Sequence, residues 1–283
     1  MGRSTIAVVA VAALALAGFG TVAASSAKAP WRIALTSNRE GDSEIYVVNS
    51  DGASARRLTH SPGWDGFPAW SPDGRKILYG GRAGAFVVNP DGTGRRKKPA
   101  AGSWSPDGRR IAFFSNQEGN NEIYVVNVDG TGWKNLSQSP SSQDIDPQWS
   151  PDGKQIAFVT DRDGNREIYV MNADGSDPRN LTNHPLRDGE DGQYGPLWSP
   201  DGRKLMFTTN RDRNVEIYAM NADGSGLRRL TRTKGYDTPL SWSPDGRRIA
   251  FRSEPVKPRW AFYVMNSDGT GVRKVDWSLP GKR

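Results

Sequence analysis

The sequence predicts an all-β protein that folds as a six-bladed β-propeller of four-stranded antiparallel blades. Trp-Ser-Pro-Asp-Gly occurs five times, with its tryptophan at positions 70, 104, 149, 198 and 242, and repeats of about 40 residues are typical of propeller blades. Six segments of the type Ile168-Tyr-Val-Met-Asn172 lack polar alternation, so both of their faces need to be buried. Blades stacked around a common axis provide that burial.

Each repeat carries four strand patterns joined by tight turns. After Trp149 the sequence predicts strands at 154–160 and 167–172, joined by a polar hairpin loop, and an outer strand that ends at 179–182. The segment Ser150-Pro-Asp-Gly153 has the Ser, Pro and Gly preferences of a type I turn. The inner strand that ends in tryptophan completes the blade.

The first blade is predicted to be incomplete. The strand patterns at 31–35 and 44–49 have no Trp-Ser-Pro-Asp-Gly before them, so this blade lacks its own inner strand. The segment 276–281 resembles a decayed copy of the motif and could supply that strand. Against this, Val275 lies much closer to Trp277 than the outer strand lies to the next motif tryptophan elsewhere. How the ring closes stays open.

The N-terminus has the pattern of an export signal. Arg3 precedes an apolar run at 6–19, and small residues follow. The run is shorter than the roughly 20 residues that a bilayer span needs, so we expect no stable membrane span after cleavage. We divide the chain into a signal peptide, 1–27, and a propeller, 28–283, which would be periplasmic or secreted.

The composition excludes several kinds of functional site and partner. The chain has no cysteine, which excludes disulfides, thiolate metal sites and a thiol nucleophile. The formal net charge of +7 would suit nucleic acid in a cytoplasmic protein, but export argues against that partner. Much of the positive charge lies in predicted outer strands, such as Arg95-Arg-Lys-Lys98 and Arg228-Arg229, where it discourages edge-to-edge aggregation.

The repeats resemble those of the TolB propeller family. The five motif copies are followed in register by Ile-Tyr-(Val/Ala)-(Val/Met)-Asn and Asp-Gly-(Ser/Thr), and the resemblance covers residues 31–276. Prolyl-oligopeptidase-type peptidases and some polysaccharide lyases have similar repeats, so the motif indicates a fold more firmly than a function. TolB has an additional α/β domain, for which there is no room between the signal and the first strand, and the Gly-x-Ser-x-Gly of the peptidases is absent. The resemblance therefore implies a propeller alone.

Candidate binding residues lie on the loops of one face. The Ser-Pro-Asp-Gly turns share one face, and the variable hairpin loops and inter-blade connections share the other, where recognition is expected. Three connections carry an acid five residues before the motif tryptophan, and a fourth acid lies close by: Asp65, Asp144, Asp237 and Asp146. Either these acids form a ring at the channel mouth that binds a cation or a basic group of a partner, or each caps local backbone.

The long connection at 187–194 is predicted to form an acidic flap beside the channel mouth. It contains Asp188, Glu190, Asp191 and Tyr194. Either a partner enters there, or the loop is a tolerated surface insertion. Aromatic residues outside the repeat pattern complete the candidate site, and they either anchor a partner or a sugar or plug the channel. They are Trp64, Phe67, Tyr194, Tyr236 and Trp260.

Patterns for catalysis and metal binding are weak. The segment 161–165 resembles part of a calcium loop but lacks the bidentate Glu, so we expect a hairpin turn. The only histidines are His60 and His184, with no nucleophile motif to complete a catalytic triad. We expect no metal, no cofactor and no enzymatic activity. Exposed ion pairs are expected across the hairpin bases, between Glu44, Glu122, Glu167 and Glu216 and the arginines Arg39, Arg162 and Arg211.

The sequence thus predicts an exported binding module, most simply a scaffold for protein-protein interaction that uses the loop face around the channel. Its partner would be another extracytoplasmic protein. Two alternatives stay open: binding of a carbohydrate or small ligand, and a propeller-type polysaccharide lyase or hydrolase that uses loop carboxylates. The scaffold needs only a rigid face of variable loops, which the repeats supply.

Overall fold

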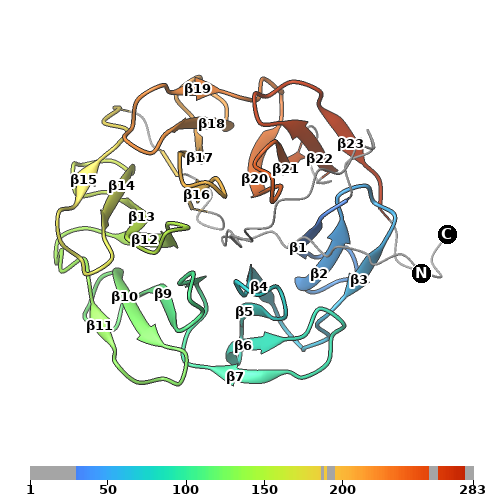
Figure 1. Ribbon diagram of the computed structural model, residues 1–283, viewed down its shortest axis with the longest axis horizontal. Coiled ribbons are helices and arrows are strands. Elements are labelled where there is room, and N and C mark those ends of the chain that lie inside the picture. The colour runs from blue at the N-terminus through green and yellow to red at the C-terminus, as the bar shows by residue number, and fades with distance from the viewer. Residues whose placement is uncertain (1–29, 186–187, 190–194, 255–260, 278–283) are drawn as a thin grey trace, which may run out of the picture.

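Six β-sheets are arranged as blades around a central axis in the computed structural model (Figure 1). The structure describes residues 30–185, 188–189, 195–254 and 261–277. Within these residues there are 23 strands and no helix, and so no helix with the length and hydrophobicity of a membrane span. The prediction of an all-β, six-bladed propeller is confirmed.

Every sheet is antiparallel, and its strands follow one another from the axis outward. Blade 1 has three strands and the other blades have four. Blade 1 contains β1 (Arg32–Ser37), β2 (Glu44–Asn49) and β3 (Ala55–Arg57); blade 2 contains β4 (Asp65–Trp70), β5 (Ile77–Gly81), β6 (Gly84–Val88) and β7 (Arg96–Lys98); blade 3 contains β8 (Ser103–Trp104), β9 (Arg110–Ser115), β10 (Glu122–Asn127) and β11 (Lys134–Asn135). Blade 4 contains β12 (Asp144–Trp149), β13 (Gln155–Thr160), β14 (Glu167–Asn172) and β15 (Arg179–Asn180); blade 5 contains β16 (Leu197–Trp198), β17 (Lys204–Thr209), β18 (Glu216–Asn221) and β19 (Arg228–Arg229); blade 6 contains β20 (Tyr236–Trp242), β21 (Arg248–Glu254), β22 (Ala261–Asn266) and β23 (Arg273–Val275).

The Ser-Pro-Asp-Gly segments are the turns between the first and second strands of a blade. In blade 4 the Ser150 hydroxyl donates to Asp152 Oδ1 over 2.6 Å, and the Gly153 N–H donates to the Ser150 carbonyl over 2.9 Å. Gly153 has a φ of 71°, in the left-handed region that favours glycine. The sequence preference at these turns therefore reflects the backbone that they adopt.

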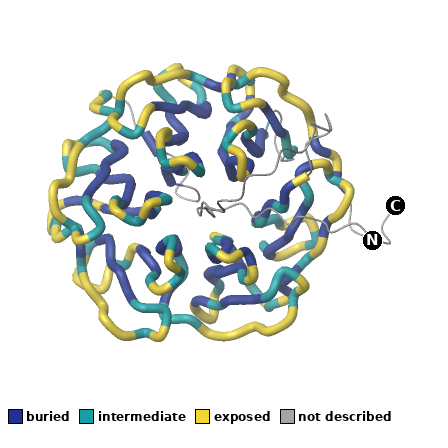
Figure 2. Tube along the Cα trace, viewed as in Figure 1, coloured by how far each residue is buried: buried dark blue, intermediate teal, exposed yellow. Residues whose placement is uncertain are grey.

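The hydrophobic core lies between neighbouring blades. One cluster combines Ile123 and Val125 of blade 3 with Trp149 and Phe158 of blade 4, and all four side chains are buried. The continuous apolar pattern of the middle strands follows from this packing, because each face of a blade contacts the next blade. Figure 2 shows buried stretches within the blades and exposed ones along the outer rim.

The motif tryptophans end the inner strands and pack between blades. An arginine of the preceding blade stacks on some of them: Arg110, at the start of β9, lies 4.7 Å from the Trp149 ring centre, and Arg32, at the start of β1, lies 4.7 Å from that of Trp70. These guanidinium groups cover the indole faces where the blades meet. The motif thus fixes both the turn and the contact with the preceding blade.

Blade 1 closes the ring without a fourth strand of its own. Arg248 of blade 6 stacks on Trp31 at 4.6 Å, so Trp31 takes the place of the missing motif tryptophan. The possibility that the C-terminal segment supplies the inner strand is not borne out for its described residues. Trp277 instead packs at the seam between blades 6 and 1, with its ring centre 5.6 Å from that of Tyr46 and 5.7 Å from that of Phe262.

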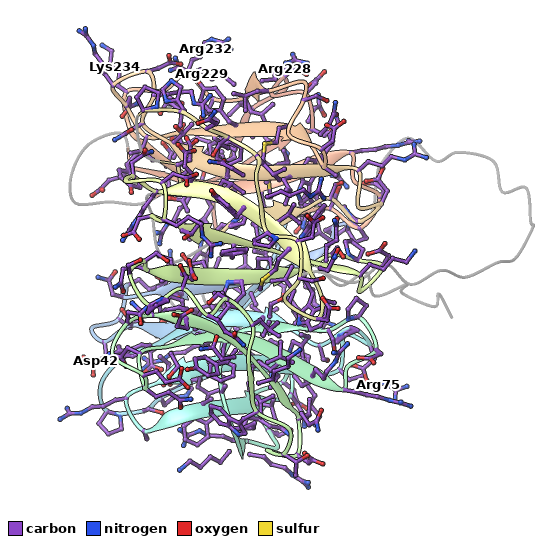
Figure 3. The ribbon with its side chains drawn as sticks, turned by 90° about the vertical axis from the view of Figure 1, so that its left-hand side faces the viewer. Asp42, Arg75, Arg228, Arg229, Arg232 and Lys234 are labelled. Atoms are coloured by element: carbon purple, nitrogen blue, oxygen red, sulfur yellow. The ribbon has the colours of Figure 1, made fainter. Side chains whose placement is uncertain are left out.

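The propeller presents two distinct faces. Figure 3, a side view, places Asp42 of the β1–β2 hairpin loop on one side and Arg75, next to a Ser-Pro-Asp-Gly turn, on the other. The outer rim carries the basic side chains that the sequence predicts at the edge strands, including the exposed Arg228 and, just beyond β19, Arg232 (Figure 3). The face with the hairpin loops is the one that contains the connections between blades.

Candidate binding site at the channel mouth

Four aspartates occupy one equivalent position where the chain enters a blade, three of them in the inner strand and one in an isolated bridge before it. The backbone N–H of each donates to the carbonyl of the residue before the glutamate-initiated strand of the preceding blade, as in the 2.8 Å bond from Asp144 to Asn121. Each carboxylate is 0–1 % exposed, so none is open to solvent at the channel mouth. The four residues are Asp65, Asp144, Asp188 and Asp237.

Asp188 belongs to this set although the sequence places it in the acidic flap. It pairs with Thr209 in a β-bridge, as Asp144 pairs with Thr160 in blade 4. Its distance to Trp198 differs from the spacing in the other blades, which conceals the equivalence. Counting from the glutamate that begins a strand of the preceding blade, Glu44, Glu122, Glu167 or Glu216, reveals it, because the aspartate follows 21 or 22 residues later in all four cases. The remaining predicted flap residues, Glu190, Asp191 and Tyr194, lie outside the described residues, as does Trp260.

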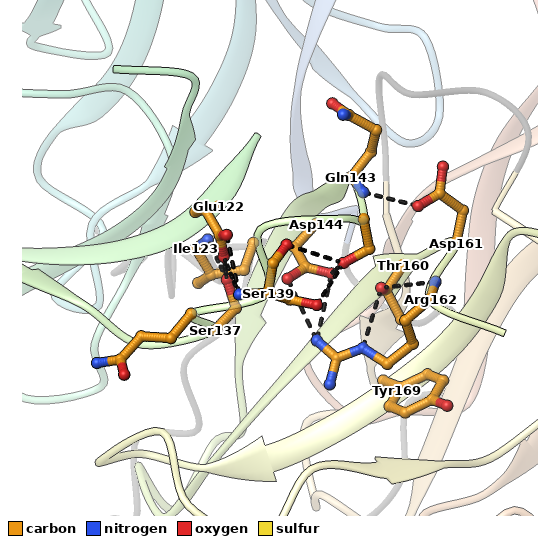
Figure 4. Close-up of polar contacts among 12 residues, drawn as sticks. Glu122, Ile123, Ser137, Ser139, Gln143, Asp144, Thr160, Asp161, Arg162 and Tyr169 are labelled. Carbon is orange, nitrogen blue, oxygen red and sulfur yellow. Dashed lines mark hydrogen bonds and ion pairs between the residues drawn. The ribbon is translucent and has the colours of Figure 1, made fainter. Parts of the chain in front are cut away.

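Arginines from the second-to-third strand loops neutralise two of these aspartates. Arg162 Nη2 lies 3.3 and 3.2 Å from the two carboxylate oxygens of Asp144, and its Nε donates to Thr160 (Figure 4). Arg211 Nη2 contacts both oxygens of Asp188 at 3.0 and 2.9 Å. A buried carboxylate needs such partners to remain ionised.

The expected pairing of the repeated glutamates with these arginines is wrong. Glu44 binds Arg57 at 2.6 Å and Glu216 binds Arg229 at 2.8 Å, while Arg39 stacks on Trp277. The glutamates are 0–3 % exposed rather than exposed, and each accepts a hydrogen bond from a hydroxyl near the end of its own blade. The hydroxyls belong to Thr59, Ser137, Thr182 and Thr231.

Burial perturbs the acids that lack an arginine. The pKa of Asp237 is raised to about 6: burial is the main cause, the nearby charge of Glu216 adds to the rise, and hydroxyls such as that of Thr233, 3.0 Å away, oppose it. Burial also raises the pKa of Asp65 and of Glu167. Within the described residues, no three His, Cys, Asp or Glu side chains come together as a set that could hold a metal ion.

A cavity of about 250 Å3 lies along the channel. Its walls are the inner strands and the prolines of the Ser-Pro-Asp-Gly turns, and its lining includes Trp64, Phe67, Phe114 and Leu240. Asp146 is the single charged side chain among the described lining residues. The described lining of the cavity is therefore largely apolar, with one acid, and suits a largely apolar group.

Two of the lining residues occupy equivalent bulges. Phe67 and Asp146 each lie two residues after the buried aspartate and directly before a proline, with φ of 56° and 54°. The strand register shifts at both places. The bulge interrupts the regular alternation of the inner strand next to the channel. The repeated Asp-x-x-Pro-x-Trp is the sequence signal for this geometry, and it escaped the sequence analysis.

Trp64 and Phe67 form an exposed aromatic pair at the mouth of the cavity. Their ring centres are 5.9 Å apart in an edge-to-face arrangement, and the residues are 47 % and 37 % exposed. Tyr236, the third described aromatic candidate, is half-buried. The structure thus brings Trp64, Phe67 and Asp146 together around one cavity, whereas Asp65, Asp144, Asp188 and Asp237 are held in the interior.

The family follows from the repeats. A family model described as the TolB beta propeller domain matches residues 93–191 and 187–282. The chain belongs to this family. This confirms the resemblance inferred from the Trp-Ser-Pro-Asp-Gly repeats of the TolB-like propeller.

Individual relatives match over different lengths. The Protein TolB homolog of Chlorobium chlorochromatii is 47% identical over 53 residues, which are 17% of this chain and 12% of that protein. The putative TolB structure from Agrobacterium tumefaciens is similar with a TM-score of 0.70 and 25% identity, over 86% of this chain and 89% of that chain. TolB from Acinetobacter baumannii gives a TM-score of 0.72 at 22% identity, over 84% of this chain and 61% of that chain.

The same architecture occurs in an enzyme. An oligogalacturonate lyase in complex with manganese has a TM-score of 0.58 at 15% identity, over 86% of this chain and 73% of the lyase chain. At such low identity the likeness shows the fold alone. The function therefore has to be argued from the site.

Proposed function

We propose that the protein is an exported binding module that recognises another extracytoplasmic protein through the loop face around the channel. The observation that carries the proposal is the exposed pair of Trp64 and Phe67 beside an apolar cavity of about 250 Å3. Large aromatic side chains at the rim of a pocket dominate the binding energy of many protein interfaces. The buried aspartates take a structural role in this proposal, because arginines or hydroxyls bind the carboxylates of Asp144, Asp188 and Asp237.

The test compares two tryptophans with equal exposure. Trp64 at the channel mouth and Trp133 on the outer edge of blade 3 are both 47 % exposed. Partners from the extracytoplasmic fraction are crosslinked to the unchanged protein and identified, and their affinity is then measured for the Trp64→Ala/Phe67→Ala variant and for Trp133→Ala. We expect the double substitution to weaken binding at least tenfold and Trp133→Ala to leave it unchanged. Equal affinity of the double variant and the unchanged protein would refute the proposal.

Glycan binding is the second candidate function, because an exposed aromatic pair also stacks on sugar rings. It is tested by titrating the protein with oligogalacturonate and following both Trp fluorescence and product formation. Saturable binding that depends on Trp64, without turnover, would favour a glycan-binding module over a protein scaffold. Formation of unsaturated products would favour a lyase over both.

A further inference from the structure

The innermost strand of blade 1, β1, has an uncovered edge. Within the described residues no strand pairs with its channel side, whereas the second strand of every other blade is covered by an inner strand. Side-chain burial reflects the difference. Ala34 is half-buried, while the residues at its position in the other blades are 0–1 % exposed. These residues are Leu78, Ala112, Ala157, Met206 and Ala250.

The backbone of β1 presents hydrogen-bonding groups along this edge. The Trp31 carbonyl accepts a bond of 2.8 Å from the Ser50 N–H and so points toward β2. Because directions alternate along a strand, the N–H and C=O groups of Arg32, Ala34 and Thr36 point to the open side. In blade 4 the carbonyl equivalent to that of Arg32 belongs to Gln155 and accepts from the Ser150 N–H over 2.8 Å.

The open edge borders the candidate binding site. Ala34 lines the cavity together with Trp70 of blade 2 and Leu240 of blade 6. A Cβ added to Gly66 would lie 3.7 Å from Thr36 Oγ1 and 3.5 Å from the Trp64 ring, so the far end of β1 lies beside the exposed aromatic pair. Within the described residues, the open side of β1 is therefore continuous with the channel mouth.

The preceding residues of the chain cannot fill this space through the turn that the other blades use. In blades 2 to 6 the Gly of the turn lies three residues before the strand position equivalent to Ile33, with φ between 66° and 71°. In blade 1 that position is Pro30. The proline ring fixes φ near −65°, so the turn is not available. The described part of the chain therefore supplies no strand for this edge.

In the other blades the inner strand ends in a tryptophan that packs between blades, and in blade 1 Trp31 already takes that place. Trp31 occupies the space between blades 6 and 1 and carries Arg248 at 4.6 Å, as Trp149 carries Arg110 at 4.7 Å. A segment added to β1 needs a small side chain beside Trp31. The inner strands of the other blades have two to seven residues, which bounds the length of the segment.

We propose that the inner edge of β1 is a strand-addition site, at which a short extended segment of the partner protein binds antiparallel to β1 and completes blade 1. Main-chain hydrogen bonds to Ala34 and Thr36 give affinity, and a small apolar side chain beside Trp31 gives selectivity. This inference rests on the proposed function, because the added strand would lie next to Trp64 and Phe67.

The test uses the full chain and a synthetic peptide as the probe. The peptide copies residues 236–241 of the inner strand of blade 6 and ends in alanine in place of Trp242. In that blade the residue paired with Ala250, the equivalent of Ala34, is Ser241. A second peptide carries an N-methyl group on this serine, which removes the hydrogen bond and leaves the side chains unchanged. Binding is followed by NMR titration and by hydrogen exchange of the backbone amides.

We expect the first peptide to bind and to protect the amides of Ala34 and Thr36, and the methylated peptide to bind at least tenfold more weakly. Ala34→Pro removes one N–H donor from the open edge and leaves the hydrogen bonds between β1 and β2 in place. We expect this variant to bind the first peptide at least tenfold more weakly, and its thermal melt checks that it folds. No binding of the first peptide, or equal binding of both peptides, would overturn the proposal, and this comparison uses the unchanged protein.

The outcome separates the two proposals. If the partner protein binds Ala34→Pro normally but fails to bind Trp64→Ala/Phe67→Ala, the channel mouth binds through side chains and strand addition is refuted. If Trp64→Ala/Phe67→Ala binds the partner normally, the proposed function fails whatever the peptides do.

Discussion

The Arg39 guanidinium lies 3.3 Å from the ring centre of Trp277, so the β1–β2 hairpin loop of blade 1 covers the last described residue of the chain. The Trp277 carbonyl also accepts a bond of 3.4 Å from Arg39 Nη1. In the same seam, Arg273 of β23 donates to the Ser50 carbonyl at 3.1 Å. The contact between the two ends of the ring thus relies on side chains rather than on a shared sheet.

Trp277→Ala should destabilise the protein by about 3 kcal/mol, because a buried aromatic ring is lost between blades 6 and 1. Val272→Ala is the control, since Val272 lies in the same part of blade 6 and is 51 % exposed; we expect a change of about 0.5 kcal/mol or less. Urea unfolding followed by circular dichroism measures both. Similar midpoints for the two variants would show that Trp277 does not hold the ring closed.

Arg211→Met should destabilise the protein by about 2 to 3 kcal/mol, because Asp188 would remain buried without its positive partner. The control is Arg179→Met, which removes an exposed pair with Asp177 and should change stability by about 0.5 kcal/mol or less. Equal unfolding free energies for the two variants would contradict a buried ion pair at Asp188.

Asp237 should make the protein less stable at pH 7 than at pH 5. Its pKa in the folded state is raised to about 6 by burial, so its contribution is present when the carboxyl is protonated and is lost as the pH rises through 6. Because the unfolded carboxyl titrates near pH 4, the loss extends from about pH 4 to pH 6 and totals about 3 kcal/mol, of which about 1 kcal/mol falls between pH 5 and pH 7. Asp237→Asn should remove this part of the pH dependence. Urea unfolding of both proteins at pH 5 and pH 7 measures the effect. If the unfolding free energy changes equally between the two pH values in both proteins, Asp237 is not the group responsible.

The blades could be predicted because they are encoded locally. The five turn motifs and the apolar middle strands each specify structure within a few residues, and Trp64 and Phe67 stood out as aromatics outside the repeat. The burial of Asp237 could not be predicted in this way, because its carboxylate meets the hydroxyl of Thr233, in the connection, and that of Ser253, on another strand.

The contact between blades 6 and 1, which closes the ring, could not be predicted from the sequence for a similar reason. Trp31 and Trp277 are far apart in sequence and lie in one cluster. A repeat pattern predicts only contacts that recur in every blade, and this contact occurs once. The position of Asp188 was hidden by the unequal length of its connection, which shifts its spacing to the following tryptophan but leaves its spacing to Glu167 unchanged.

Two turn glycines should respond differently to alanine. Gly153 has a φ of 71°, and an added Cβ would meet only the Pro106 ring, with Cδ at 3.5 Å and Cγ at 3.7 Å, which are ordinary contacts. Gly153→Ala should therefore cost about 1 to 2 kcal/mol, the price of placing alanine in the left-handed region. Gly175 has a φ of 95°, and its added Cβ would lie 2.7 Å from the Leu136 carbonyl oxygen of the preceding blade.

Gly175→Ala should cost more than Gly153→Ala, because the blades would have to move apart in addition to the backbone strain. Both glycines lie in turns on the face opposite the hairpin loops, so partner binding at the channel mouth should be unaffected in either variant that folds. Thermal melts and binding measurements on the two variants test this together. Loss of binding by Gly153→Ala at an unchanged melting temperature would mean that the turn face, rather than the loop face, contacts the partner.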